Sequence, residues 1–148
     1  MPTSLNSSAN EAAALRAQAA AFREFPLASP PAEPRALELW LQHAAGFILF
    51  EKVRASGLAT LEPDAPEDIR KAVDVAIDAT IYALMMQIDG VTGGLRSDER
   101  ELNLTFGVEL VAHDSVVAKV DLREGDGMCM GFHGWVEGDF GESAVVEK

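Results

Sequence analysis

The spacing of apolar residues changes once along this chain, and that change limits the folds it can adopt. Before residue 90, apolar side chains recur at every third or fourth position, which is the period of an α-helix. After residue 101 they recur at every second position, which is the period of a strand with one buried face. Because the helical segments all come first, the pattern predicts an α+β fold, with N-terminal helices packed on one face of a C-terminal antiparallel sheet.

Two helices are predicted in the first third of the chain. Residues 11–25 are rich in alanine, which favours a helix, and an apolar stripe that includes Leu15 and Phe22 predicts one buried face. A second helix is predicted from residue 34 to residue 56, because proline suits the first helical turn and Gly57 is typical of a helix end.

The third predicted helix, about 65–89, has the clearest signals. Asp64 can cap its first turn, Gly90 can end it, and its apolar stripe is wide enough to predict a central position. Alternation over 102–110 and again over 116–122 then predicts two strands that form an antiparallel hairpin.

Three further segments complete the predicted organisation. Residues 1–10 are polar, and we expect them to be flexible; residues 11–148 are predicted to form a single domain. Residues 26–34 contain four of the seven prolines, which predicts an extended connector without a helix. The tail, 143–148, is predicted to add a short edge strand.

The charge balance excludes some partners and favours others. Twelve basic and twenty-four acidic residues give a formal net charge of −12. Such a chain repels nucleic acid phosphates and anionic membranes, so neither is expected as a partner, whereas a basic protein is. A single cysteine agrees with a reducing compartment, and the polar start of the sequence does not resemble a signal peptide, so we expect the cytoplasm.

The segment 125–141 has the most unusual composition, with six glycines among seventeen residues. Alternation predicts a third strand over 128–133. If Cys129 and His133 lie in one strand, they are about 13 Å apart, which is too far for a nucleophile and its base. We therefore predict no catalytic residue. Because no zinc or calcium motif and no phosphate-binding loop are present, we predict no metal and no cofactor either.

The same segment supplies a candidate binding patch in which carboxylates surround aromatic rings. Aromatic anchors beside acids suit the lysines and arginines of a protein partner. The alternative is an acidic, solvated face whose aromatic rings point into the core. The candidate binding residues are His133, Trp135, Glu137, Asp139, Phe140 and Glu142.

The sequence TIYALMMQIDG at 80–90, followed by a β-hairpin and an aromatic, glycine-rich tail, resembles small bacterial proteins of unknown function. Some of these are similar to immunity proteins that neutralise a cognate toxin. The resemblance covers about residues 65–140 and transfers no functional residue. It implies a non-enzymatic protein-binding module, an immunity-type inhibitor of a basic toxin, and the acidic balance agrees with this.

Two alternative functions remain open. One is a small enzyme or ligand-binding domain that uses the segment 125–141, with Cys129, His133 and Asp139. The other is a structural accessory protein that forms a homo-oligomer, for example a homodimer paired through an exposed strand edge.

Overall fold

The computed structural model describes residues 4–141 and 144–146, and the chain divides into two compact units. Unit 1 comprises residues 1–24 and 48–81, and unit 2 comprises residues 25–47 and 82–148. The prediction of a single domain over 11–148 stays a prediction.

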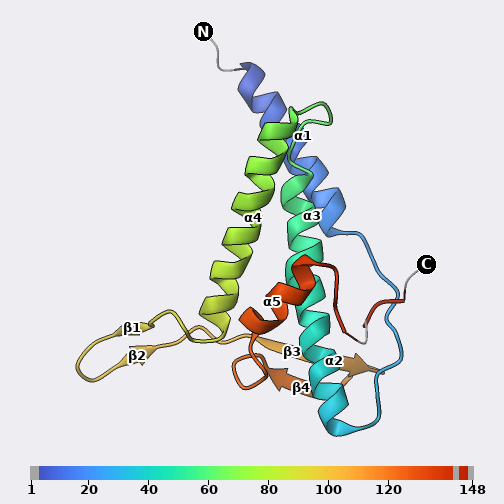
Figure 1. The fold of residues 1–148 in the computed structure, drawn as a ribbon, viewed down its shortest axis with the longest axis vertical. Helices are drawn as coiled ribbons and strands as arrows, with labels where there is room; N and C mark the ends of the chain where they lie inside the picture. Colours follow the sequence, from blue (N-terminus) through green and yellow to red (C-terminus); the bar gives the residue numbers. More distant parts are fainter. Residues whose placement is uncertain (1–3, 142–143, 147–148) are drawn as a thin grey trace. The chain divides into compact units, whose positions relative to one another are not determined.

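The chain has the predicted α+β fold, with the long helices N-terminal to two small antiparallel sheets (Figure 1). The part of the chain before Gly90 forms α1 (Ser4–Ala21), α2 (Pro34–Phe47), the π-helix η1 (Ile48–Lys52), α3 (Val53–Leu58) and α4 (Glu67–Ile88). The second half forms β1 (Leu95–Arg96), β2 (Glu101–Leu102), β3 (Gly107–Ala112), β4 (Ser115–Asp121) and α5 (Met128–Val136).

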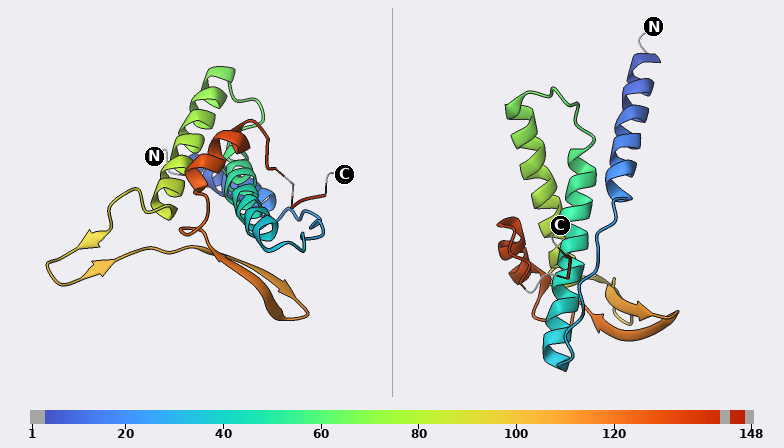
Figure 2. Two further views of the ribbon diagram at one scale, coloured as in Figure 1. Left: turned by 60° about the horizontal axis from the view of Figure 1, so that its bottom comes forward. Right: turned by 90° about the vertical axis from the view of Figure 1, so that its right-hand side faces the viewer.

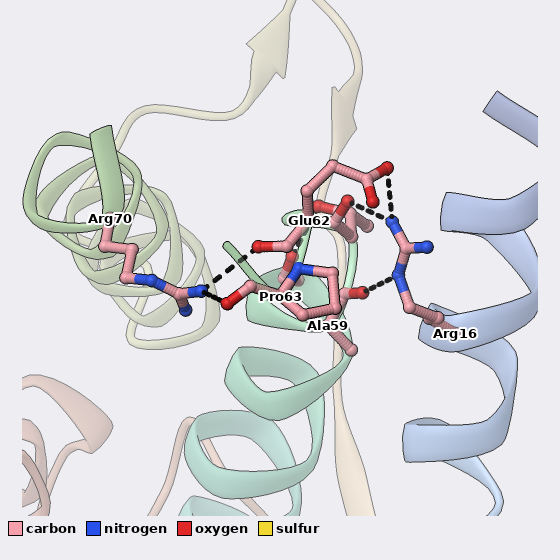
Figure 3. A network of polar contacts seen from close by, with 7 residues as sticks. Arg16, Ala59, Glu62, Pro63 and Arg70 are labelled. Carbon is pink, nitrogen blue, oxygen red and sulfur yellow. Dashed lines mark hydrogen bonds and ion pairs between the residues drawn. The ribbon is translucent and has the colours of Figure 1, made fainter. Parts of the chain in front are cut away.

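In unit 1, two arginines hold the loop between α3 and α4 (Figure 3). The guanidinium of Arg16 on α1 donates hydrogen bonds to the carbonyl of Ala59 at 3.0 Å and to the carboxylate of Glu62 at 3.0 Å. From the other side, the guanidinium of Arg70 on α4 donates to the carbonyls of Glu62 at 3.1 Å and of Pro63 at 2.6 Å. Because these carbonyls lie beyond the end of α3, they have no partner within the helix, and the two arginines satisfy them.

Inside unit 1, α3 and α4 are joined by a shared cation. The guanidinium of Arg54 on α3 contacts the carboxylates of Asp74 and Asp78 on α4, the latter at 2.7 Å. Burial lowers the pKa of Arg54, but the hydrogen bond and the charges of the two carboxylates outweigh it and raise that pKa overall. Arg54 therefore stays charged throughout the physiological range.

In unit 2, α2 lies against the β3–β4 hairpin (Figures 1 and 2), and one cluster of core residues lies between them. Trp40 and Leu41 of α2 are buried, and Val108 of β3 and Val120 of β4 pack against them. Val108 and Val120 are opposite each other in the antiparallel register, so the predicted alternation does place one face of the hairpin on a helix.

The hairpin turn is tight, with positive φ at His113 (48°) and Asp114 (60°). Two consecutive left-handed residues form the turn that matches the twist of paired strands. The first predicted strand is shorter than expected, because residues 103–106 form no strand and residues 101–102 pair instead with 95–96 in a separate hairpin.

Glu33 lies just before the first residue of α2, and Gly90 follows the end of α4. The carboxylate of Glu33 accepts hydrogen bonds from the backbone N–H groups of Arg35 at 3.0 Å and Ala36 at 2.6 Å, and these lower its pKa. Gly90 has φ of +70°, the left-handed conformation that ends a helix and that glycine adopts without strain. The predicted bounds of the third helix, 65–89, are confirmed to within two residues. The second predicted helix, 34–56, begins where expected but is divided into α2, η1 and α3, and Gly57 lies inside α3 instead of ending the helix.

The first predicted helix differs from α1 in its extent and in its packing. α1 begins at Ser4, so part of the polar segment 1–10 is helical. The predicted buried stripe is wrong, because Leu15 is 60% exposed and Phe22 is 74% exposed. An alanine-rich sequence favours a helix whether or not one of its faces is buried. It therefore cannot indicate which apolar side chains of the helix pack against other elements.

The third predicted strand, 128–133, is wrong, because these residues lie in α5. Alternation over six residues cannot be told from a short helix by period alone, and contacts from distant residues decide between them. The predicted tail strand falls partly outside the described residues. Within them, Val145 forms an isolated antiparallel bridge with Leu27 of the connector, and residues 26–33 of that connector contain no helix.

Throughout the described ranges, no helix combines the length and the apolar character needed to cross a bilayer.

Candidate functional site

Trp135, the central residue of the predicted binding patch, is fully buried at 0% exposure. Its indole lies between Gly46 of α2 and Gly131 of its own helix, α5. A Cβ atom at Gly46 would approach the ring to 2.3 Å, and one at Gly131 would approach it to 2.4 Å. Only glycine fits at either place, so these residues form a two-glycine socket for the tryptophan.

The indole also forms a hydrogen bond and stacks on another ring. Its Nε1–H donates to Nδ1 of His43 on α2 at 3.0 Å, which satisfies the one polar group of a buried tryptophan. The ring of Phe140 stacks on it at 6.4 Å between centroids and contacts Phe47 edge-on at 5.2 Å. Trp135 and Phe140 thus join α5 to α2 within unit 2.

The acids of the predicted patch lie outside this aromatic cluster. Glu137, Asp139 and His133 are exposed, and Glu142 lies outside the described residues. The carboxylate of Asp139 accepts a hydrogen bond from the backbone N–H of Gly141 at 2.9 Å, which shapes the chain after α5. The structure separates the aromatic rings, of which Trp135 is buried and Phe140 half-buried, from the exposed acids, so Trp135 packs in the core and offers no surface to a partner. A binding role for the acids stays a prediction.

Cys129 lies at the start of α5 beside Asp89 and Tyr82. Partial burial, followed by a hydrogen bond to the Asp89 carboxylate and the charge of that group, raises the pKa of the thiol to about 11. Because α5 is a helix, Cys129 and His133 are four residues apart on one face, closer than a strand would place them. Yet within the described residues no hydrogen bond joins the two side chains, and a thiol with so high a pKa is a poor nucleophile at neutral pH.

A half-open hollow of about 400 Å³ lies between α2 and β4, and we call it the α2–β4 hollow. Apolar side chains that also contact the core line part of it, and carboxylates line the rest. The lining residues are Pro34, Leu37, Glu38, Leu41, Ala118, Lys119, Val120, Asp121 and Glu124.

The cations near this hollow are already paired. Arg35 contacts Glu38 at 2.8 Å and Asp126 at 2.5 Å, and both pairs raise its pKa. Lys119 contacts Glu109 across the hairpin at 2.9 Å, which raises its pKa. These interactions keep Arg35 and Lys119 charged and engaged with carboxylates of the same chain.

Glu124 differs from its neighbours in the hollow. In the part of the chain that the structure describes, no side chain forms a hydrogen bond or an ion pair with its carboxylate. The next cation in sequence, Arg123, has its guanidinium against Gly90, where a built Cβ would come within 2.5 Å of it, and it lines a different hollow. The α2–β4 hollow therefore keeps an excess of negative charge.

Sequence patterns identified the apolar residues of this hollow as core-facing but did not identify the hollow. Its walls come from segments about eighty residues apart, and nothing in the spacing of either segment shows which helix packs on which strand. Among the described residues, no group of three or more potential ligands could hold a metal ion.

Comparison with known proteins found no match: no family model, no curated protein and no solved structure is similar enough to this chain to indicate its relatives. The resemblance to immunity proteins therefore stays a prediction.

Proposed function

We propose that this chain is a non-enzymatic binding module that recognises a basic protein through unit 2. The observation that carries this proposal is the distribution of charge between the units. Unit 2 contains six basic and fifteen acidic residues, a formal charge of −9 out of the −12 of the whole chain. A surface with one dominant sign attracts an oppositely charged partner and speeds their association.

Ion pairs within unit 2 leave this net charge unchanged, but they engage several of its cations. Arg35, Arg96 and Lys119 each contact at least one carboxylate, so they are not available to balance other acids. The remaining carboxylates are exposed to solvent at several places, including Asp98, Glu99 and Asp114 around the hairpin turns. A partner with clustered lysines and arginines would find few competing cations.

The class of partner that we propose is a basic toxin, which this chain would neutralise in the cytoplasm as an immunity-type inhibitor. A protein that only binds and blocks needs a complementary surface and no reacting group. The raised pKa of Cys129 agrees with that role, since it leaves the only thiol of the chain largely protonated at neutral pH.

The test is to purify the chain from its native cells at low salt and to identify what accompanies it by mass spectrometry. We expect a protein with more lysine and arginine than aspartate and glutamate. Its dissociation constant should rise by at least about tenfold between about 50 mM and about 500 mM salt, because salt screens charges at a surface. Co-expression of this chain should also relieve any growth inhibition that the partner causes.

A matched variant separates charge from fold. Changing Asp98, Glu99 and Asp114 together to Asn, Gln and Asn removes charge from exposed hairpin turns and should slow association without altering thermal stability. An accompanying protein that is neutral or acidic, or an affinity that salt does not change, contradicts the proposal.

A further inference from the structure

We infer that the α2–β4 hollow receives a lysine or arginine side chain of the basic partner. This inference rests on the proposed function and deepens it, because it assigns one place on unit 2 to one kind of group.

The hollow matches both parts of such a side chain. Leu37 and Leu41 of α2 and Val120 of β4 offer an apolar wall, against which a chain of methylene groups can lie. Lysine and arginine bury their aliphatic stems in this way while their charged ends stay beside polar groups. A volume of about 400 Å³ is near the lower end for a ligand pocket, which suits one side chain better than a large ligand.

The charges of the hollow select a cation. Asp121 and Glu124 line it together with Glu38, which is already paired with Arg35, and the carboxylate of Glu124 has no side-chain partner in the described part of the chain. The one lysine in the lining, Lys119, contacts Glu109 instead. An anionic group would meet these carboxylates at close range, and an aliphatic group would remove water from Glu124 without replacing its hydrogen bonds.

The test uses small probes on the whole protein and needs no partner. Amide spectra of the isotope-labelled chain are recorded during titration with N-acetyl-lysine methylamide, with N-acetyl-arginine methylamide, and with the uncharged N-acetyl-norleucine methylamide. We expect saturable shifts, with dissociation constants in the millimolar range, that are confined to residues 37–41 and 118–124. The norleucine probe should bind at least about threefold more weakly.

Two variants make the result specific. Glu124→Gln should weaken binding of both cationic probes at least about threefold, while Glu11→Gln, which changes an exposed acid on α1, should leave it unchanged. Ala118→Met, which fills the hollow with a flexible apolar side chain, should abolish the localised shifts in a protein that still unfolds cooperatively. Shifts that are absent, that spread over unit 2, or that are equal for norleucine overturn the inference.

The proposed function and this inference can fail separately. If a basic partner is found and binds Glu124→Gln and Ala118→Met as tightly as the unchanged chain, the hollow is not its contact, although unit 2 still binds it. If the probes bind in the hollow but no basic partner accompanies the chain, the proposed function fails while the hollow keeps its preference for cations.

Discussion

The carboxylate of Asp89 accepts a hydrogen bond from the backbone N–H of Met128 at 2.7 Å, and its other oxygen accepts one from Cys129 at 2.8 Å. An acid just beyond the end of α4 therefore caps the first turn of α5. These two amide groups have no acceptor within their own helix, and a negative charge near a helix N-terminus is favourable in addition.

Replacing Asp89 by alanine should lower the free energy of unfolding by about 1–2 kcal/mol, which is the usual cost of losing a capping side chain. Urea denaturation followed by circular dichroism measures this difference. The control is Asp98→Ala, which changes an exposed acid in the turn after β1 and should alter stability by less than about 0.5 kcal/mol. Equal effects of the two substitutions would show that the cap contributes nothing.

The two-glycine socket of Trp135 gives a second prediction. Gly46→Ala places a methyl group 2.3 Å from the indole, so the ring must move, and we expect a loss of at least about 1–3 kcal/mol. Gly93→Ala is the matched control, because a Cβ there meets no atom within 4 Å. Thermal unfolding of both variants decides the matter: a Gly46→Ala melting temperature equal to that of the control would exclude the socket.

Cys129 should react slowly with alkylating reagents. The thiolate is the reactive form, and with a pKa of about 11, against about 8.5 for a free cysteine, its rate with iodoacetamide at pH 8 should be on the order of a hundredfold below that of the urea-unfolded chain. Asp89→Asn removes the charge that helps to raise this pKa, so it should speed the reaction. A native rate equal to the unfolded rate would contradict the environment described for this thiol.

The same thiol makes stability depend on pH in the alkaline range. Its pKa is higher in the folded chain than in the unfolded chain, so the unfolded chain loses the proton first. The contribution of Cys129 is therefore complete below about pH 9 and is lost as the pH rises towards about 11. In the Cys129→Ser variant, the free energy of unfolding should decrease less steeply between these pH values. If the slope is unchanged, the decrease comes from other groups.

Arg54 should stabilise unit 1 by joining α3 to α4. Arg54→Met keeps most of the aliphatic stem but removes the cation shared by Asp74 and Asp78, so two neighbouring carboxylates lose their partner. We expect a loss of about 1–2 kcal/mol at low salt and a smaller loss at high salt, where screening weakens the pairs. Lys71→Met, at an exposed position of α4, is the control and should change little in the same denaturation experiment.

Patterns within short stretches of sequence correctly predicted the elements whose conformation depends on residues near to them in the sequence. The helix that ends at Gly90 and the hairpin that turns at His113 and Asp114 follow from apolar period, capping residues and turn chemistry. The segment 128–133 was predicted wrongly because its conformation depends on Asp89, which caps it from about forty positions earlier in the sequence. No pattern within the segment itself records that contact.

The candidate site shows the same division. Sequence alone marked Trp135 and Phe140 as notable, but it could not decide between surface anchors and core residues, because that choice depends on α2 lying against α5. The sequence did not predict the α2–β4 hollow for a similar reason. Nothing in the sequence distinguishes Glu38 and Glu124 from the other acids, and only the packing of a helix on a distant strand brings them to one opening.

The socket around Trp135 ties three positions together. A methyl group at position 46 or 131 is excluded only while a full indole occupies position 135. A smaller ring there, such as phenylalanine, would make room for alanine on either side. In homologous sequences we therefore expect these positions to vary jointly, and such covariation would let α2 and α5 be recognised as neighbours without a structure.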